Sequence, residues 1–143
     1  MIQIWIAYPD DFLFRPLKYQ DIKKENISEV NGDGFKLRLI KDENVEIADI
    51  SNPNLNTQKI IHGIIEAGKF VNIDIPNNFN ACLYIIDGEI KIMGENIESR
   101  KLVWFNNDGE NIRINAISNS QFLLLSGESL EKTLAQYYSE ITN

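Results

Sequence analysis

Histidine and cysteine are almost absent from this sequence, which has one of each in 143 residues. The single cysteine, Cys82, excludes a disulfide within the sequence, and its apolar neighbours predict a reduced, buried thiol rather than a reactive nucleophile. No apolar run approaches the ~20 residues of a membrane helix, so we expect no membrane partner. The N-terminal apolar stretch has no basic residues before it. We therefore predict no secretory signal and expect a cytoplasmic protein.

Basic residues are in the minority as well. The sequence has 14 Lys and Arg against 21 Asp and Glu, which gives a formal net charge of −7. Binding to nucleic-acid phosphates needs clustered Lys and Arg, so the composition argues against a nucleic-acid partner. An acidic surface favours solubility, and a basic protein partner is the alternative explanation.

Short β-forming stretches fill the chain between turn signals. The strongest of these signals are Asp33-Gly34, Asp87-Gly88 and Asp108-Gly109. Residues 35–40, 69–75 and 111–117 alternate between apolar and other side chains, as half-buried strands do. Residues 121–127 form a nearly continuous apolar run, which indicates a strand covered on both faces. Eight to ten strands at this spacing predict an all-β sandwich or barrel.

Both ends of the chain differ from this pattern. Leucine, tyrosine and isoleucine recur at helical spacing in residues 130–141, and Ser129 before them is a plausible N-cap. We therefore predict an N-terminal strand and linker arm over residues 1–30, a barrel domain over 31–128, and a short C-terminal helical tail over 129–143.

The stretch "CLYIIDGEIKIMG" is typical of two strands joined by a tight turn. Asp87-Gly88 suits a type I′ turn, in which both central residues need positive φ. This pattern resembles the middle of a cupin, a small jelly-roll barrel formed by a double-stranded β-helix. With "IPNNFNACLYIIDGEIKIMGENI", "QFLLLSGESLEKTLAQY", "IIEAGKFVNIDIP" and "IQIWIAYPDDFLFRPLKYQDI", nearly the whole chain resembles the second, C-terminal cupin domain of the pirin family. The quercetinase-like pirins are related and share the "QIWI" junction between the two domains.

The resemblance also shows which residues are missing. Cupin metal sites use two histidines spaced by one residue, then a glutamate, and a third histidine in a later hairpin. Here the glutamate position is Ala81, and the later hairpin has no histidine. In pirins the metal belongs to the first cupin, so the resemblance implies the metal-free half. We expect no metal and no cofactor.

Four residues are candidates for lining a barrel cavity that holds a small aromatic molecule: His62, Tyr84, Trp104 and Phe105. The favoured alternative is that the aromatic residues fill the core, as interior side chains do in small barrels. His62 is also a candidate metal ligand with Glu66 and Asp74. Its apolar neighbours favour a hydrogen-bonded strand histidine instead.

Three function hypotheses follow. The favoured one is a pirin-like cupin that acts as a non-catalytic structural or protein-interaction module. The second is half of a pirin-type quercetin 2,3-dioxygenase that needs a metal-bearing cupin partner, and the third is a small-ligand binder. Residues 1–9 carry an apolar stripe, Ile2, Ile4 and Ile6, which needs a partner strand. We expect this strand to pair in one of three ways. It pairs within its own domain, with a second copy of the chain in a homodimer formed by strand exchange, or with a separate cupin or other protein.

Overall fold

The computed structural model describes residues 2–4, 21–41, 58–106, 109–129, 133, 135, 136 and 139. The chain divides into two compact units, one made of Met1–Ile22 and Ser129–Asn143 and the other of Lys23–Glu128. The ten described strands all lie in the second unit. Residues 2–4 belong to no strand, and the rest of the predicted N-terminal strand lies outside the described residues.

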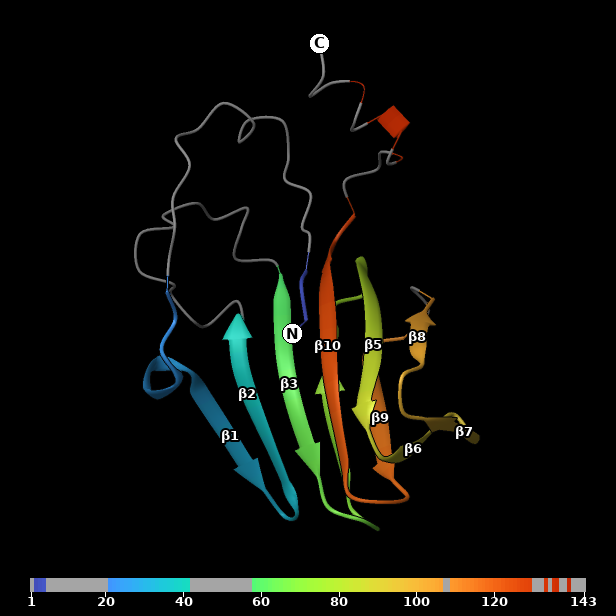
Figure 1. Ribbon diagram of the computed structural model, residues 1–143. Helices are drawn as coiled ribbons and strands as arrows, with labels where there is room; N and C mark the ends of the chain where they lie inside the picture. The colour runs from blue at the N-terminus through green and yellow to red at the C-terminus, as the bar shows by residue number, and fades with distance from the viewer. Residues whose placement is uncertain are drawn as a thin grey trace. The chain divides into compact units, whose positions relative to one another are not determined.

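The Lys23–Glu128 unit consists of two antiparallel sheets, as Figure 1 shows. A short 3-10 helix, η2 (Lys24–Asn26), precedes the first strand. The strands are β1 (Ser28–Gly32), β2 (Phe35–Lys41), β3 (Lys59–Ile65), β4 (Phe70–Asp74), β5 (Phe79–Asp87), β6 (Glu89–Ile92), β7 (Glu95–Glu98), β8 (Leu102–Phe105), β9 (Asn111–Ala116) and β10 (Ser120–Glu128). The six-stranded sheet has the order β1-β2-β3-β10-β5-β8, and the four-stranded sheet has the order β4-β9-β6-β7. Of the predicted all-β fold, the mostly-β composition and the two antiparallel sheets are confirmed.

The segment around Asp87-Gly88 is not the hairpin that the sequence suggests. Strands β5 and β6 belong to different sheets, and Gly88 is the corner at which the chain crosses from one to the other. Gly88 has φ +84°, whereas Asp87 is not among the residues with positive φ, so the expectation of a type I′ turn was wrong. A Cβ at residue 88 would collide with the carbonyl oxygen of Asn119. Gly88 is therefore needed where the chain turns from one sheet to the other. Turn propensity alone does not distinguish such a corner from a hairpin turn.

Hairpins form at two other places in this unit. Strands β1 and β2 turn at Asp33-Gly34, as predicted, with Gly32 opposite Phe35. Strands β6 and β7 turn at Met93 and Gly94, whose φ angles are 50° and 90°. Positive φ at both central residues is what a type I′ turn requires, although methionine is an unusual residue for it.

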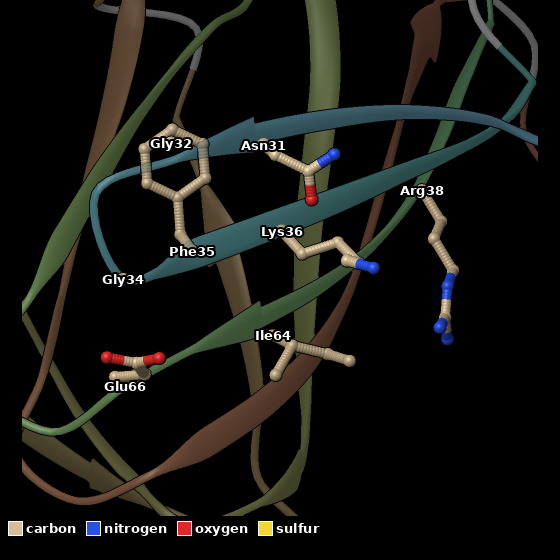
Figure 2. Close-up of a pocket in the computed structure, with 8 residues that line it drawn as sticks. All are labelled: Asn31, Gly32, Gly34, Phe35, Lys36, Arg38, Ile64 and Glu66. Atoms are coloured by element: carbon tan, nitrogen blue, oxygen red, sulfur yellow. The ribbon is translucent and has the colours of Figure 1, made fainter.

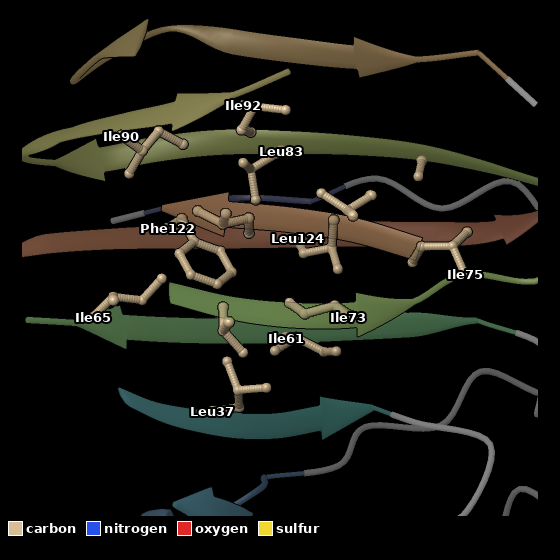
Figure 3. Packing of buried hydrophobic residues seen from close by; sticks show 14 of the residues in the cluster. Leu37, Ile61, Ile65, Ile73, Ile75, Leu83, Ile90, Ile92, Phe122 and Leu124 are labelled. Carbon is tan, nitrogen blue, oxygen red and sulfur yellow. The ribbon is translucent and has the colours of Figure 1, made fainter. Parts of the chain in front are cut away.

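The core lies between the two sheets and is almost wholly aliphatic (Figure 3). Alternation along the strands directs every second side chain inward, since successive residues of a strand point to opposite faces. The fully buried side chains of the core include Ile65, Leu83, Ile85, Ile90, Ile114, Phe122 and Leu124. Gly63 leaves room for the ring of Phe122, which a Cβ at residue 63 would overlap.

The described part of the C-terminal tail shows a capping box. The backbone N–H of Gln136 donates to Thr133 Oγ1 at 3.2 Å, and the N–H of Thr133 donates to Gln136 Oε1 at 2.8 Å. Residues 135, 136 and 139 are helical, whereas Thr133 is not. Within the described residues a capped turn thus begins after Thr133, and most of the predicted tail, residues 130–132 after Ser129 included, lies outside the described residues. No described helix is long and apolar enough to cross a membrane.

Candidate functional site: the outer face of the six-stranded sheet

The space between the sheets does not suit a metal ion. Ala81, Leu83 and Ile85 point into it from β5, and all three are buried. The buried polar side chains of the described residues are those of Ser120 and Ser126, and a serine hydroxyl is not a preferred ligand for a transition metal. The described residues include no group of three or more His, Cys, Asp or Glu side chains placed to hold a metal. The interior therefore does not fit the metal centre of a cupin.

Three of the four candidate cavity residues lie on the outer surface of the six-stranded sheet. His62, Tyr84 and Trp104 occupy the strand positions that alternate with the buried ones. Phe105 lies on the opposite side of β8 and packs against the core. None of the four lines either of two hollows found on this unit. The structure does not gather these side chains around one interior space, and the small-ligand hypothesis stays a prediction.

The strand register arranges these outer side chains in rows across the sheet. One row runs through Glu29, Arg38, His62, Leu123, Tyr84 and Leu102. A second row runs through Ile60, Leu125, Cys82 and Trp104. We call the surface made by these ten residues, together with Lys36 and Ile64, the outer face. It is polar over β1 and β2 and apolar from β10 to β8.

The apolar side of the outer face ends in two exposed large side chains. Leu102 is 63% exposed and Trp104 is 65% exposed, both on the edge strand β8. Trp104 lies directly opposite Cys82 in the β5–β8 pairing. Burial raises the pKa of the Cys82 thiol, so the thiolate that would make this cysteine reactive is disfavoured.

The polar side of the outer face contains a small ion-pair network. Glu29 Oε1 accepts a hydrogen bond from Arg38 Nε at 2.9 Å, and Oε2 accepts one from Lys36 Nζ at 3.0 Å. The Arg38 bond, and then the Lys36 bond, lower the pKa of the Glu29 carboxyl. Figure 2 shows Lys36, Arg38 and Ile64 along a shallow hollow of about 360 Å³ over β1 to β3. The amine of Lys36 and the guanidinium of Arg38 give this polar side several hydrogen-bond donors for a binding partner.

His62 lies where the two sides of the outer face meet. Arg38 and Leu123 flank it on the neighbouring strands. Burial and then the charge of Arg38 lower the pKa of His62, and the side chain of Gln121 opposes them. The predicted combination with Glu66 and Asp74 does not form. Asp74 belongs to the other sheet, and no metal-holding group occurs among the described residues.

The outer surface of the four-stranded sheet is different. Its outward positions are polar, for example Asn72, Asp74 and Lys91, and they are exposed. Phe70 is the apolar exception, 45% exposed, and the guanidinium of Arg113 lies 3.9 Å from its ring centre. The outer surface of the four-stranded sheet is thus polar and suited to contact with solvent, whereas much of the outer face of the six-stranded sheet is apolar.

The sequence contains a signal of the outer face, although the candidate residues predicted from it do not include this face as a site. Residues 60–65, 81–86 and 122–125 are apolar at both odd and even positions, with the exceptions of His62 and Gly63. These runs are the central strands β3, β5 and β10 of the six-stranded sheet. A strand that is apolar on both faces is typical of a sheet covered on both sides. The double coverage was predicted for β10 alone.

Comparison with known proteins agrees with the two-sheet fold. The sequence family described as the pirin C-terminal cupin domain matches residues 60–143. The chain belongs to the pirin family. A Vibrio cholerae protein named "Putative quercetin 2,3-dioxygenase" is 27% identical over 146 residues, which cover 99% of this chain and 51% of that protein.

Solved structures show the same fold in this pirin-family chain and in longer proteins. A quercetin 2,3-dioxygenase from Acinetobacter baumannii superposes with a TM-score of 0.79 at 20% identity, over 96% of this chain and 52% of that one. A Geobacillus kaustophilus protein superposes with a TM-score of 0.77 at 20% identity, over 91% of this chain and 54% of that one. The chain spans about half the length of the curated relatives that it matches.

Proposed function

We propose that this chain is a single jelly-roll cupin domain of the pirin type that acts as a non-catalytic structural or protein-interaction module. The observation that supports it is the filled interior. Where a cupin would direct imidazole and carboxylate ligands inward, this chain has Ala81 and aliphatic neighbours at 0–5% exposure, such as Leu83 and Ile92. A metal ion needs three or four such donors around it. The polar and apolar groups that could recognise another molecule lie on the outer face instead.

A second candidate function is half of a pirin-type quercetin 2,3-dioxygenase. It is favoured by the names of the relatives and by the share of their length that this chain spans, which is 51%, 48% and 52%. In this case a metal-bearing cupin partner supplies the metal ligands and the chemistry. The present chain supplies a rigid sandwich that supports the partner. Both candidates need a protein partner, and they differ in whether the assembled pair oxidises quercetin.

The proposal includes the partners expected from the sequence. A homodimer formed by exchange of residues 1–9 and a separate cupin partner are the two arrangements, in a cytoplasmic protein. Light scattering coupled to gel filtration distinguishes them, because exchange gives a particle of twice the 16.4 kDa chain mass without any other protein. A single-chain mass for the purified protein would rule out the exchanged dimer.

Metal content tests the non-catalytic role. The purified protein is incubated separately with Fe(II), Mn(II), Ni(II) and Zn(II), desalted, and measured by elemental mass spectrometry. We expect less than about a tenth of an ion per chain, since the described interior provides no ligand set. One tightly held ion per chain, lost in His62→Gln, would contradict the proposal. Oxygen consumption with quercetin, by the chain alone and with its partner, then tests the second candidate.

A further inference from the structure

The outer surface of the four-stranded sheet contains an arginine that is held in a fixed orientation. The guanidinium of Arg113 lies 3.9 Å from the ring centre of Phe70, and its Nε donates to Asn115 Oδ1 at 3.3 Å. Asn115 is fixed in turn, because its Nδ2 donates to the carbonyl oxygen of Lys91 at 3.2 Å. The ring stack and the Nε bond leave the two terminal amino groups of Arg113 available as donors to another molecule.

Two cations on this surface are not neutralised by an acid. Within the part of the chain that the structure describes, neither Arg113 nor Lys91 belongs to an ion pair. Both side chains are exposed, although the chain has a formal net charge of −7. An arginine held in place without an acidic partner is suited to bind an anion from outside the protein.

The strand register brings three donor side chains close together. Asn72 on β4 lies directly opposite Arg113 on β9, and Lys91 on β6 lies directly opposite Asn115. Arg113 and Asn115 are two residues apart on one strand, so they share a face. Lys91 is therefore a diagonal neighbour of Arg113 at roughly 7–8 Å, which long side chains can bridge. The Asn72 amide, the Arg113 guanidinium and the Lys91 ammonium can converge on one group above β9.

The acidic residues nearest to these donors lie at the margins of the surface. Asp74 is the last residue of β4, and Glu89 is the first residue of β6. Glu89 Oε1 accepts a hydrogen bond from Asn96 Nδ2 at 3.1 Å. An anion placed between Arg113 and Lys91 therefore contacts two cations before it meets a carboxylate.

The donor set fits a phosphate group better than a carboxylate. An arginine binds two oxygens of one anion in parallel, whereas a lysine supplies a point charge. A phosphate monoester offers three acceptor oxygens and about two negative charges at neutral pH. These match the two terminal amino groups of Arg113 together with the ammonium of Lys91. A carboxylate has two oxygens and one charge, so it would leave Lys91 without a contact.

We propose that the outer surface of the four-stranded sheet binds the phosphate group of a small phosphate ester. Arg113 holds two of the phosphate oxygens, Lys91 contacts the third, and the amide of Asn72 donates from the neighbouring strand. Phe70 is a positioning residue. Its ring fixes the plane of the guanidinium before the ligand arrives, so less side-chain freedom is lost on binding.

Titration with phenyl phosphate, followed by calorimetry and two-dimensional NMR of the ¹⁵N-labelled chain, tests the site. We expect a dissociation constant below about 1 mM, with the largest amide shifts at residues 72, 91 and 113. Arg113→Gln should weaken binding at least about tenfold, and Lys91→Gln about threefold to tenfold, because each removes a charged contact. Phe70→Leu keeps the arginine but removes the ring beneath it, so it should weaken binding about threefold to fivefold. These residues are exposed, so the variants should fold, and circular dichroism checks this.

Arg100→Gln is the matched control. Arg100 is also an exposed arginine, but it lies on the connection between β7 and β8 and not on the sheet surface. Its substitution should change the dissociation constant less than about twofold, as expected for a distant site. Inorganic phosphate should bind within about threefold of phenyl phosphate, whereas acetate should bind at least about tenfold more weakly.

Four results would overturn the inference. They are a dissociation constant above about 1 mM for phenyl phosphate, equal losses in Arg100→Gln and Arg113→Gln, amide shifts centred on Lys36 and Arg38 of the other sheet, and acetate binding as tight as that of phosphate. An unchanged affinity in Phe70→Leu would show that the ring does not position the guanidinium and would overturn that part of the proposal.

Discussion

Ser120 and Ser126 lie on the same strand, β10, and both are buried, but within the described part of the chain only Ser120 has hydrogen-bond partners for its hydroxyl. Ser120 Oγ lies 2.8 Å from the carbonyl oxygen of Ser118 and 3.0 Å from that of Glu89. Ser126 Oγ has no hydrogen-bond partner among the residues that the structure describes, although the side chain is directed inward beside Ala81. A buried hydroxyl without a partner costs about 1–3 kcal/mol, whereas a satisfied one contributes roughly 1 kcal/mol.

This contrast predicts opposite effects of the same substitution. Ser126→Ala should leave the free energy of unfolding unchanged or raise it by about 1 kcal/mol, because it removes an unsatisfied polar atom. Ser120→Ala should lower it by roughly 1–2 kcal/mol, because it removes a satisfied bond at the sheet-to-sheet corner. Urea denaturation of the two variants measures both values. A larger loss of unfolding free energy in Ser126→Ala than in Ser120→Ala would contradict the assignment of Ser120 as the hydrogen-bonded serine and Ser126 as the unsatisfied one.

Gly63 and Phe122 provide a test of core packing. Gly63 lies on β3 opposite Phe122 on β10, and a Cβ at residue 63 would overlap the phenyl ring. Phe122 is fully buried and cannot move aside without disturbing the core. Gly63→Ala should therefore cost about 2–3 kcal/mol of stability by overpacking.

Gly109→Ala is the matched control for this substitution. A Cβ at residue 109 meets no atom within 4 Å, and φ there is not positive. We expect a change within about 0.5 kcal/mol, as for most surface substitutions. Similar losses in the two variants would mean that the loss at residue 63 comes from backbone effects and not from the ring.

The sequence predicted the strands better than their partners. Residues 35–40, 69–75 and 111–117 alternate with the period of a half-buried strand, and each corresponds to a strand with the expected buried side. Asp87-Gly88 has the composition of a hairpin, yet it joins strands of different sheets. Local propensity reports that a chain turns, whereas the choice of sheet depends on long-range pairing with β9 and β10.

Tyr84 and Trp104 lie on the outer surface of the sheet, and not in the expected interior, for a related reason. Tyr84 and Trp104 are aromatic, and an interior position is the usual expectation for such residues in a small barrel. Their positions in the strands decide the face, and this depends on register: Ala81, Leu83 and Ile85 are inward, so Tyr84 is outward. When every residue of a strand is apolar, composition does not reveal which set faces the core.

His62 predicts a pH dependence that one measurement can follow. Burial and Arg38 lower its pKa from the ordinary 6.5, so the folded protein binds its proton less readily than the unfolded chain does. Stability from this residue is therefore fully present above about pH 6.5 and is lost as the pH falls from there toward the folded-state pKa. Because the chain has a single histidine, one pair of imidazole resonances reports the titration by NMR.

Variants of Arg38 test the cause of this shift. Arg38→Gln should raise the pKa of His62 partway toward 6.5, since burial remains as the first cause. Arg113→Gln, on the outer surface of the other sheet, should leave the titration unchanged. A pKa of His62 at or above 6.5 in the native protein would contradict the arrangement around the ring.

Alkylation of Cys82 can be used to test the packing of side chains on the outer face. Its thiol lies opposite Trp104, is half-buried, and has a pKa raised by burial, so alkylation by iodoacetamide at pH 8 should be slow in the folded protein. Trp104→Ala should speed the reaction about three- to tenfold by removing a neighbour that covers the sulfur, while Phe70→Ala should not change it. Mass spectrometry follows the single alkylated cysteine with time. If Cys82 reacts as fast in the native protein as in urea, then Trp104 does not shield the thiol. The side chains on the apolar side of the outer face would then not pack closely enough around Cys82 to exclude the reagent.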